Sequence, residues 1–191
     1  MSRLSVFLIQ DNPLADKLLN GISPYQLALD EANSFCSAIN EKNSDISASL
    51  SVVSSAELIE KIKESNCDIA VIHDSLRPLV GVSQFQRAFE ALSDFDAVRP
   101  TMAFTETIKA LDSDGRLAET IDREKVRRLS SPEVIKVSAI DFAGKADSWS
   151  VPLKAGVRIG EVAADPETIR INNDSDLEVI AAYLALNSAS R

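Results

Sequence analysis

One stretch near the middle of the chain, residues 67–78, constrains the fold more than any other. It reads Cys-Asp-Ile-Ala-Val-Ile-His-Asp-Ser-Leu-Arg-Pro, a short apolar run that ends abruptly in polar and charged residues. The apolar part is too short for a helix and is typical of a strand buried on both faces in a parallel sheet. Asp74 then falls at the carboxyl end of that strand, the edge at which open α/β sheets bind ligands. An aspartate-capped turn without a further role is the alternative interpretation.

Strand-like and helix-like segments alternate along the first half of the chain. The pattern predicts strands at 3–9, 47–53 and 99–104, and helices at 24–41, from 54 to about 63, and at about 83–93. Such alternation is typical of helices packed on both faces of a mostly parallel sheet, so we expect a three-layer α/β fold. A chain of 191 residues with 45% hydrophobic content can bury a full core, and 1–191 is expected to form a single domain.

Composition restricts the partners and the location that we expect. The formal net charge of −9 disfavours non-specific binding to nucleic acid or to an anionic membrane surface. Cys36 and Cys67 lie far apart and the chain has one histidine, so we expect neither a disulfide framework nor a structural zinc site. No basic leader and no long apolar segment is present, so we expect no membrane span and a cytoplasmic location. Trp149 is expected only to pack.

Three stretches of the sequence resemble one enzyme family. Residues 73–78, His-Asp-Ser-Leu-Arg-Pro, resemble the His-Asp-Ala-Ala-Arg-Pro signature of the 2-C-methyl-D-erythritol 4-phosphate cytidylyltransferases, which act in non-mevalonate isoprenoid biosynthesis. Residues 105–123 resemble the family's Thr-Asp-Thr-Ile-Lys-x-x-Asp-x-Asp-Gly segment and its closing Thr-Leu-Asp-Arg. Residues 165–177 resemble its Asp-Pro-x-Asn-Ile-Lys-Ile-Thr-Thr-Pro-Glu-Asp-Leu. The resemblance implies a Rossmann-like nucleotide-diphospho-sugar transferase fold with a projecting β-arm.

The same resemblance implies roles for individual residues. Asp74 and Arg77 stand at catalytic positions, and Asp74 would also hold the metal ion, Mg²⁺ in an active enzyme. The residues implied on the side of the polyol phosphate are Thr107, Arg123, Ser131 and Arg170. Arginine suits that role because its guanidinium group binds phosphate in a bidentate way, although a surface ion pair with a neighbouring carboxylate is the alternative for Arg123. Lys17 matches the family's nucleotide-binding lysine, with an unrelated solvent-facing lysine as the alternative.

Residues 105–123 also carry a pattern of their own. Two alternating segments flank Ser-Asp-Gly at 113–115, which predicts a β-hairpin. An isolated two-stranded hairpin is marginally stable in water without a partner. In the family this arm embraces a second subunit, so the resemblance implies a homodimer.

Two family motifs for the nucleotide are missing. The family has a glycine-rich Ala-Ala-Gly-x-Gly-x-Arg loop after its first strand, where the backbone approaches the triphosphate of CTP. Residues 11–17 read Asp-Asn-Pro-Leu-Ala-Asp-Lys, with no glycine and two carboxylates, Asp11 and Asp16. The Gly-Gly-x-x-Arg-x-x-Ser motif is also absent, and Ser54 and Ser55 are interpreted as helix caps. The nucleotide half of the site is therefore missing.

Three hypotheses follow from this pattern. The first is a catalytically weak or inactive homologue, a pseudoenzyme that keeps a pocket for a small phosphorylated anion. The second is an active CTP-dependent cytidylyltransferase with an unusual loop. The third is a receiver-like signalling domain, with Asp11, Asp74 and Thr105 in a phosphoacceptor pocket. The arm has no place in a receiver fold, and a dimer built on the arm would argue against that hypothesis.

Overall fold

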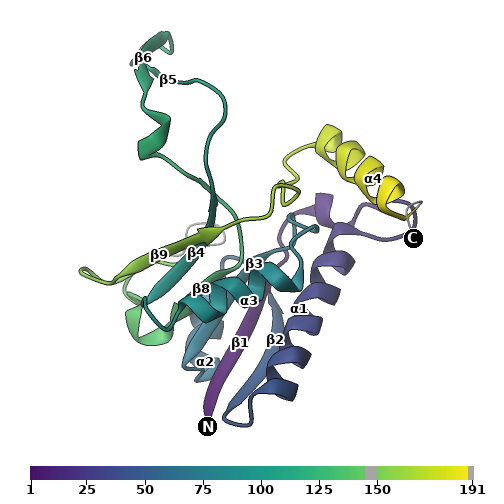
Figure 1. Cartoon of the computed structure of the whole chain (residues 1–191), viewed down its shortest axis with the longest axis vertical. Helices are drawn as coiled ribbons and strands as arrows, with labels where there is room; N and C mark the ends of the chain where they lie inside the picture. Colours follow the sequence, from purple (N-terminus) through teal and green to yellow (C-terminus); the bar gives the residue numbers. More distant parts are fainter. Residues whose placement is uncertain (145–149, 189–191) are drawn as a thin grey trace.

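The computed structural model describes residues 1–144 and 150–188 and contains a seven-stranded mixed sheet (Figure 1). Trp149 lies outside the described residues. The strands of this sheet are β1 Ser2–Ile9, β2 Ile46–Val53, β3 Ile69–Asp74, β4 Ala97–Met102, β7 Arg128–Leu129, β8 Glu133–Lys136 and β9 Ile159–Ala163. Their spatial order is β2-β1-β3-β8-β4-β7, and β9 pairs with β4.

The long ladders of the sheet are parallel. Strand β1 pairs in parallel with β2 and β3, and β4 pairs in parallel with β9. The short strand β8 lies antiparallel between β3 and β4, because the chain returns from the arm in the opposite direction. The predicted mostly parallel α/β fold is confirmed, with the central antiparallel strand as an addition that the sequence pattern did not predict.

Helices cover both faces of the sheet (Figure 1). Helix α1 (Pro24–Lys42) and helix α3 (Val82–Ala91) pack on one face, where the rings of Phe35 and Phe85 lie 5.2 Å apart. Helix α2 (Leu58–Ser65) packs on the other face with the 3₁₀ turn η3 (Val137–Ala139). Successive residues of β1 alternate between the two cores, as a doubly covered strand requires.

Two of the predicted elements have different bounds in the structure. Helix α2 begins at Leu58 and not at residue 54, because the Glu57 carboxylate accepts a hydrogen bond from the Ser54 hydroxyl (2.6 Å) and closes a separate turn. Strand β4 begins at Ala97, two residues before the predicted start. Pairing with β8 and β9 extends it, which is a tertiary effect.

A third small core closes the carboxyl end of the sheet. Helix α4 (Asp174–Ser188) and the 3₁₀ turn η1 (Pro13–Asp16) pack there around Leu76 and Ile171. No helix in the described ranges 1–144 and 150–188 is long and apolar enough to span a bilayer.

The predicted hairpin is present and stands away from the body (Figure 1). It consists of β5 (Ile108–Leu111) and β6 (Leu117–Ile121), which among the described residues pair only with each other, and the 3₁₀ turn η2 (Arg123–Lys125) follows. At its tip Gly115 has φ +76°, a conformation that favours glycine. Leu111 and Leu117 face each other across the pair and are 64% and 75% exposed.

Candidate functional site

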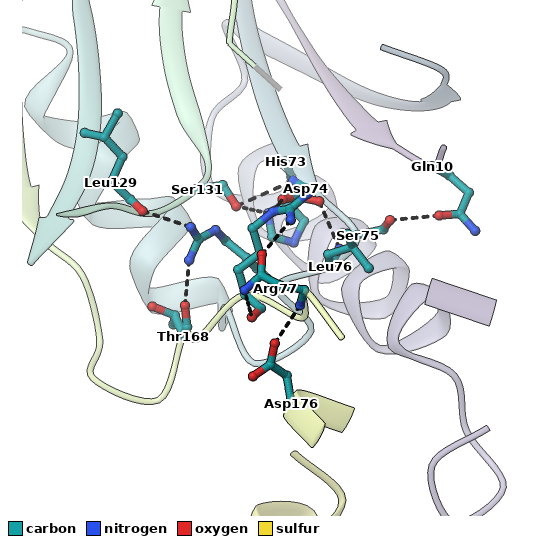
Figure 2. Close-up of polar contacts among 12 residues, drawn as sticks. Gln10, His73, Asp74, Ser75, Leu76, Arg77, Leu129, Ser131, Thr168 and Asp176 are labelled. Atoms are coloured by element: carbon teal, nitrogen blue, oxygen red, sulfur yellow. Dashed lines mark hydrogen bonds and ion pairs between the residues drawn. The ribbon is translucent and has the colours of Figure 1, made fainter. Parts of the chain in front are cut away.

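Asp74 ends β3 at the carboxyl edge of the sheet and is only 3% exposed. Its Oδ1 accepts a hydrogen bond from the backbone N–H of Leu76 (3.0 Å), which closes the turn after the strand (Figure 2). Its Oδ2 accepts from Nε of Arg170 (2.7 Å). Both carboxylate oxygens are therefore engaged, one in shaping the loop and one in orienting an arginine.

Arg77 connects two distant segments to this loop. Its Nη1 donates to the carbonyl oxygen of Thr168 and its Nη2 to that of Leu129, both at 2.9 Å (Figure 2). Burial lowers the pKa of Arg77 to about 10; Asp74 opposes that shift, and nearby arginines add to it. The side chain remains charged at neutral pH, and two of its donors are used to hold the surrounding backbone.

Ser131 lies behind Asp74 and pairs with His73, which the site prediction did not include. The Ser131 Oγ is 2.8 Å from Nδ1 of His73, and both residues are fully buried (Figure 2). Burial, followed by the charge of Arg77, lowers the pKa of His73 to about 3, so the imidazole is neutral at neutral pH. Its ring packs edge-on against Phe85 at 4.9 Å. The serine hydroxyl is thus oriented by a neutral histidine inside the core.

A second buried polar residue supports Ser131 and was also missed. Gln84 is fully buried, donates from Nε2 to the carbonyl oxygen of Ser131 (2.6 Å) and accepts at Oε1 from the N–H of Asp165 (2.6 Å). It therefore links α3 to both segments that border the site. A signal was present in the sequence, since a glutamine directly before Phe85 falls on the buried face of a short amphipathic helix.

A pocket of about 360 Å³ opens beside these residues. Its lining residues are Arg77, Arg128, Ile169, Arg170, Asn172 and Asp176. Arg170 is held toward Asp74 by Nε and toward Asn172 by Nη1, which donates to Oδ1 at 2.9 Å. The lining contains three guanidinium groups and one carboxylate, so the pocket suits an anion. Arg128 belongs to no motif and was not predicted.

Three predicted site residues lie elsewhere. Thr107 is exposed on the arm, and Arg123 at its base donates from Nη1 to the carbonyl oxygen of Thr105 (2.7 Å). Nε of Arg123 also lies 3.9 Å from a carboxylate oxygen of Glu124, the ion pair proposed as its alternative. Lys17 forms an exposed ion pair with Asp174 (2.5 Å). The structure therefore brings together Asp74, Arg77, Ser131 and Arg170, and leaves these three apart.

The loop after β1 is folded on itself. The amide N–H of Leu14 donates to Oδ1 of Asn12 (2.9 Å), that of Ala15 to the Asn12 carbonyl (3.0 Å), and that of Lys17 to the Leu14 carbonyl (3.4 Å). Pro13 has no N–H to donate. These backbone donors are used inside the 3₁₀ turn, so they form no concave nest for phosphate oxygens.

The acidic side chains of this loop are also occupied. Asp11 accepts from the N–H of Ser55 with both oxygens, at 3.0 and 2.9 Å, and Asp16 accepts from Nε2 of Gln10 at 2.7 Å. Gln10 in turn accepts from the Ser75 hydroxyl at 2.8 Å (Figure 2). The loop is thus tied to the end of β3 and carries negative charge there.

The residues around Asp74 fit a protein-held metal ion poorly. Among residues 1–144 and 150–188, no group of three or more histidine, cysteine, aspartate or glutamate side chains could hold one. Magnesium in phosphoryl-transfer sites is held by one or two carboxylates together with substrate phosphates. Asp74 would be the single carboxylate here, and its Oδ2 is already paired with Arg170.

The sheet order, the polar end of β3 and the separate β-arm together define a Rossmann-like nucleotidyltransferase fold. Similar solved structures include 4-diphosphocytidyl-2C-methyl-D-erythritol synthase from Anaerococcus prevotii, with a TM-score of 0.75 and 18% identity over 96% of this chain and 99% of that one. Another is the 2-C-methyl-D-erythritol 4-phosphate cytidylyltransferase from Thermus thermophilus, with a TM-score of 0.68 and 17% identity. That match covers 94% of this chain and 97% of the Thermus chain.

The sequence comparison identifies the family within that class. The family model IspD, described as 2-C-methyl-D-erythritol 4-phosphate cytidylyltransferase, matches residues 50–186, and the chain belongs to this family. Membership excludes the receiver-like hypothesis, which also has no place for the arm or for the antiparallel β8. The match begins after the loop that follows β1, so residues 1–49 lie outside it.

Curated relatives match about three fifths of the chain. A bifunctional enzyme IspD/IspF from Rhodopseudomonas palustris (strain HaA2) is 33% identical over 128 residues, 62% of this chain and 32% of the relative. The 2-C-methyl-D-erythritol 4-phosphate cytidylyltransferase of Parasynechococcus marenigrum is 30% identical over 125 residues, 61% of this chain and 55% of the relative. The chain therefore matches between about a third and just over half of the length of these relatives.

Proposed function

We propose that this chain is a pseudoenzyme of the cytidylyltransferase family that binds a small phosphorylated polyol and has lost ordinary CTP-dependent turnover. The observation that carries this proposal is the contrast at the carboxyl edge of the sheet. A pocket with three guanidinium groups lies on one side, and an acidic loop with internally bonded amides lies on the other.

Loss of the nucleotide half is expected to be severe for catalysis. Nucleotidyl transfer depends on preorganised donors at the phosphate where charge develops, and removal of one such donor typically lowers the rate by roughly 10² to 10³. In this chain the loop after β1 presents Asp11 and Asp16 in place of several glycine amides. A triphosphate would therefore meet repulsion where an active enzyme supplies attraction.

An active CTP-dependent enzyme of isoprenoid biosynthesis is the second candidate, favoured by the family match across Asp74, Arg77 and Arg170. Mg²⁺ brought by CTP would supply charge for the phosphates and would have to replace Arg170 at Oδ2 of Asp74. Pairing of Asp74 with an arginine instead supports binding of a phosphate without a metal ion.

Calorimetry and an activity assay test the proposal together. We expect methylerythritol phosphate to bind with the same affinity with and without Mg²⁺, whereas CTP with Mg²⁺ gives no measurable heat. A pyrophosphate-release assay is expected to remain at background. CTP binding in the micromolar range, or pyrophosphate release that is lost in Asp74→Ala, would contradict the proposal and favour the active enzyme.

We also propose that the chain forms a homodimer through the arm. A lone two-stranded hairpin is marginal in water, and Leu111 and Leu117 leave apolar surface exposed on it. Sedimentation at micromolar concentration is expected to give a dimer for the wild type and a monomer for Leu111→Ser/Leu117→Ser. A monomeric wild type would refute this part of the proposal.

We further propose that residues 1–191 form one domain and that the protein works in the cytoplasm. Two of the apolar clusters lie on opposite faces of one sheet and the third lies at its carboxyl end, which supports a single cooperative unit. Cys36 and Cys67 are buried free thiols, as suits a reducing compartment. A single unfolding transition by calorimetry is expected, and two separate transitions would contradict the first point.

A further inference from the structure

We propose that Arg128 is an anion-binding residue that completes the pocket within one subunit, so that a phosphate group is held without the arm of a second subunit. The inference rests on the proposed function for the nature of the organic ligand. It differs from the family resemblance, which places Arg123 of the arm on the phosphate and gives residue 128 no role.

The position of Arg128 follows from strand pairing. Residues 128 and 129 form β7, which pairs antiparallel with the end of β4 and places Met102 opposite Arg128. The next residue, Leu129, offers its carbonyl oxygen to Nη2 of Arg77 at 2.9 Å. The backbone that carries Arg128 is thus fixed to the same guanidinium group that lines the pocket.

The guanidinium group of Arg128 has no strong partner of its own. Its Nη2 lies 3.1 Å from the sulfur of Met102, and a thioether is a weak acceptor. No ion pair joins Arg128 to a carboxylate in the described part of the chain. Glu106 is close enough for Arg128 to contribute to the lowering of its pKa, but the Thr105 hydroxyl is the main cause of that shift. Most of the Arg128 donors therefore remain available to a ligand.

The neighbouring arginine shows the opposite arrangement. Nη1 of Arg127 donates to the carbonyl oxygens of Glu124 and Val126, both at 3.0 Å, and its Nε lies 3.4 Å from a carboxylate oxygen of Glu161. Both side chains are exposed and carry the same charge. They differ in what they contact, since Arg128 lines the pocket and Arg127 does not.

The other charged groups that line the pocket leave its net charge positive. Arg77 contributes mainly charge, because both of its Nη atoms already donate to carbonyl oxygens. Asp176, the single carboxylate in the lining, accepts from the amide N–H of Asn172 (2.7 Å) and of Asn173 (3.3 Å). These amides partly offset its charge. A phosphate dianion would therefore gain from three guanidinium groups and face one carboxylate that is already hydrogen bonded.

Titration with inorganic phosphate, followed by NMR chemical shifts, tests the role of Arg128 directly. We expect Arg128→Gln to weaken phosphate binding about 10-fold, the loss typical of one charge-assisted contact. The matched control Arg127→Gln is expected to stay within about 2-fold of the wild type, since a screened surface charge contributes little. Arg128→Lys should recover part of the affinity, and Arg123→Gln should lose less than Arg128→Gln.

The outcomes separate this inference from the proposed function. Equal affinities for Arg128→Gln and Arg127→Gln would overturn the inference, as would a larger loss in Arg123→Gln than in Arg128→Gln. Neither result would affect binding of methylerythritol phosphate by the wild type. Binding of phosphate through Arg128 without binding of methylerythritol phosphate would uphold the inference and refute the proposed ligand. A wild type that binds neither compound would overturn both.

Discussion

The two sides of the site are held by different kinds of contact. On the side of the arginine-lined pocket the contacts are buried or half-buried: Arg77 bonds to residues 91 and 52 positions away, and Ser131 to a histidine 58 positions away. On the side of the loop after β1 the contacts are exposed or half-buried, whether Leu14 bonds to Asn12, two positions away, or Ser55 to Asp11, 44 positions away. A buried network of distant partners resists substitution because each change leaves a polar group unsatisfied. Water can replace the exposed contacts of the loop, so we expect that side to tolerate substitution better.

Among the substitutions, removal of Arg77 is expected to lower the free energy of unfolding most. Arg77→Ala would leave the carbonyl oxygens of Thr168 and Leu129 without their donors and would take charge from beside Asp74. We expect the free energy of unfolding to fall by about 3 kcal/mol in urea titration. The control Arg116→Ala, which removes an exposed arginine from the arm, should change it by less than about 0.5 kcal/mol. Similar values for the two variants would show that the network is not cooperative.

Stability is also expected to depend on pH through His73. His73 has a pKa of about 3 in the folded protein against 6.5 in the unfolded chain, so below 6.5 the unfolded state binds a proton that the folded state does not. Stability from this group is therefore complete above pH 6.5 and falls as pH drops from 6.5 toward 3, by up to about 1.4 kcal/mol per pH unit.

The difference between wild type and His73→Asn isolates that effect, because the chain has one histidine. Buried Glu133 has a raised pKa, chiefly through burial, and contributes in the opposite direction as pH rises above 4.5. Both proteins contain Glu133, so its contribution cancels in the difference. Parallel stability curves for the two proteins between pH 4 and 7 would mean that folding does not lower the pKa of His73.

Substitutions in the loop after β1 are expected to change the free energy of unfolding less. Asp11→Ala removes two hydrogen bonds to one exposed amide, that of Ser55, so water can replace them. We expect a loss of about 1 kcal/mol of unfolding free energy and no change in phosphate binding. A loss as large as that of Arg77→Ala would show that the loop belongs to the same cooperative network as the pocket.

Lys17 is expected to give the smallest effect. Its ion pair with Asp174 is exposed on both sides, with side chains 50% and 72% accessible. Lys17→Met should change stability by less than about 0.5 kcal/mol. It should also leave phosphate binding unchanged, whereas a marked loss of affinity would restore the nucleotide-binding role that the family resemblance implies for Lys17.

Some features of this protein were determined by local sequence alone. The short apolar run before His73 and Asp74 is typical of a strand covered on both faces, and Ser-Asp-Gly between alternating segments favours a hairpin. The absence of glycine from residues 11–17 likewise predicted a loop without a backbone nest, and its amides are bonded inside the 3₁₀ turn. These features depend on periodicity and on backbone preferences, which neighbouring residues in the chain decide.

Only the tertiary structure decided which polar groups meet. The chain returning from the arm places β8 antiparallel inside the sheet, and this brings Ser131 to His73 and Arg128 to the rim of the pocket. Gln84 acquires its role only because α3 packs it against two loops, where it bonds to Ser131 and Asp165. Burial and distant partners fix the pKa of His73 and the pairing of Asp74 with Arg170, because desolvation and charge depend on neighbours in space rather than in the chain.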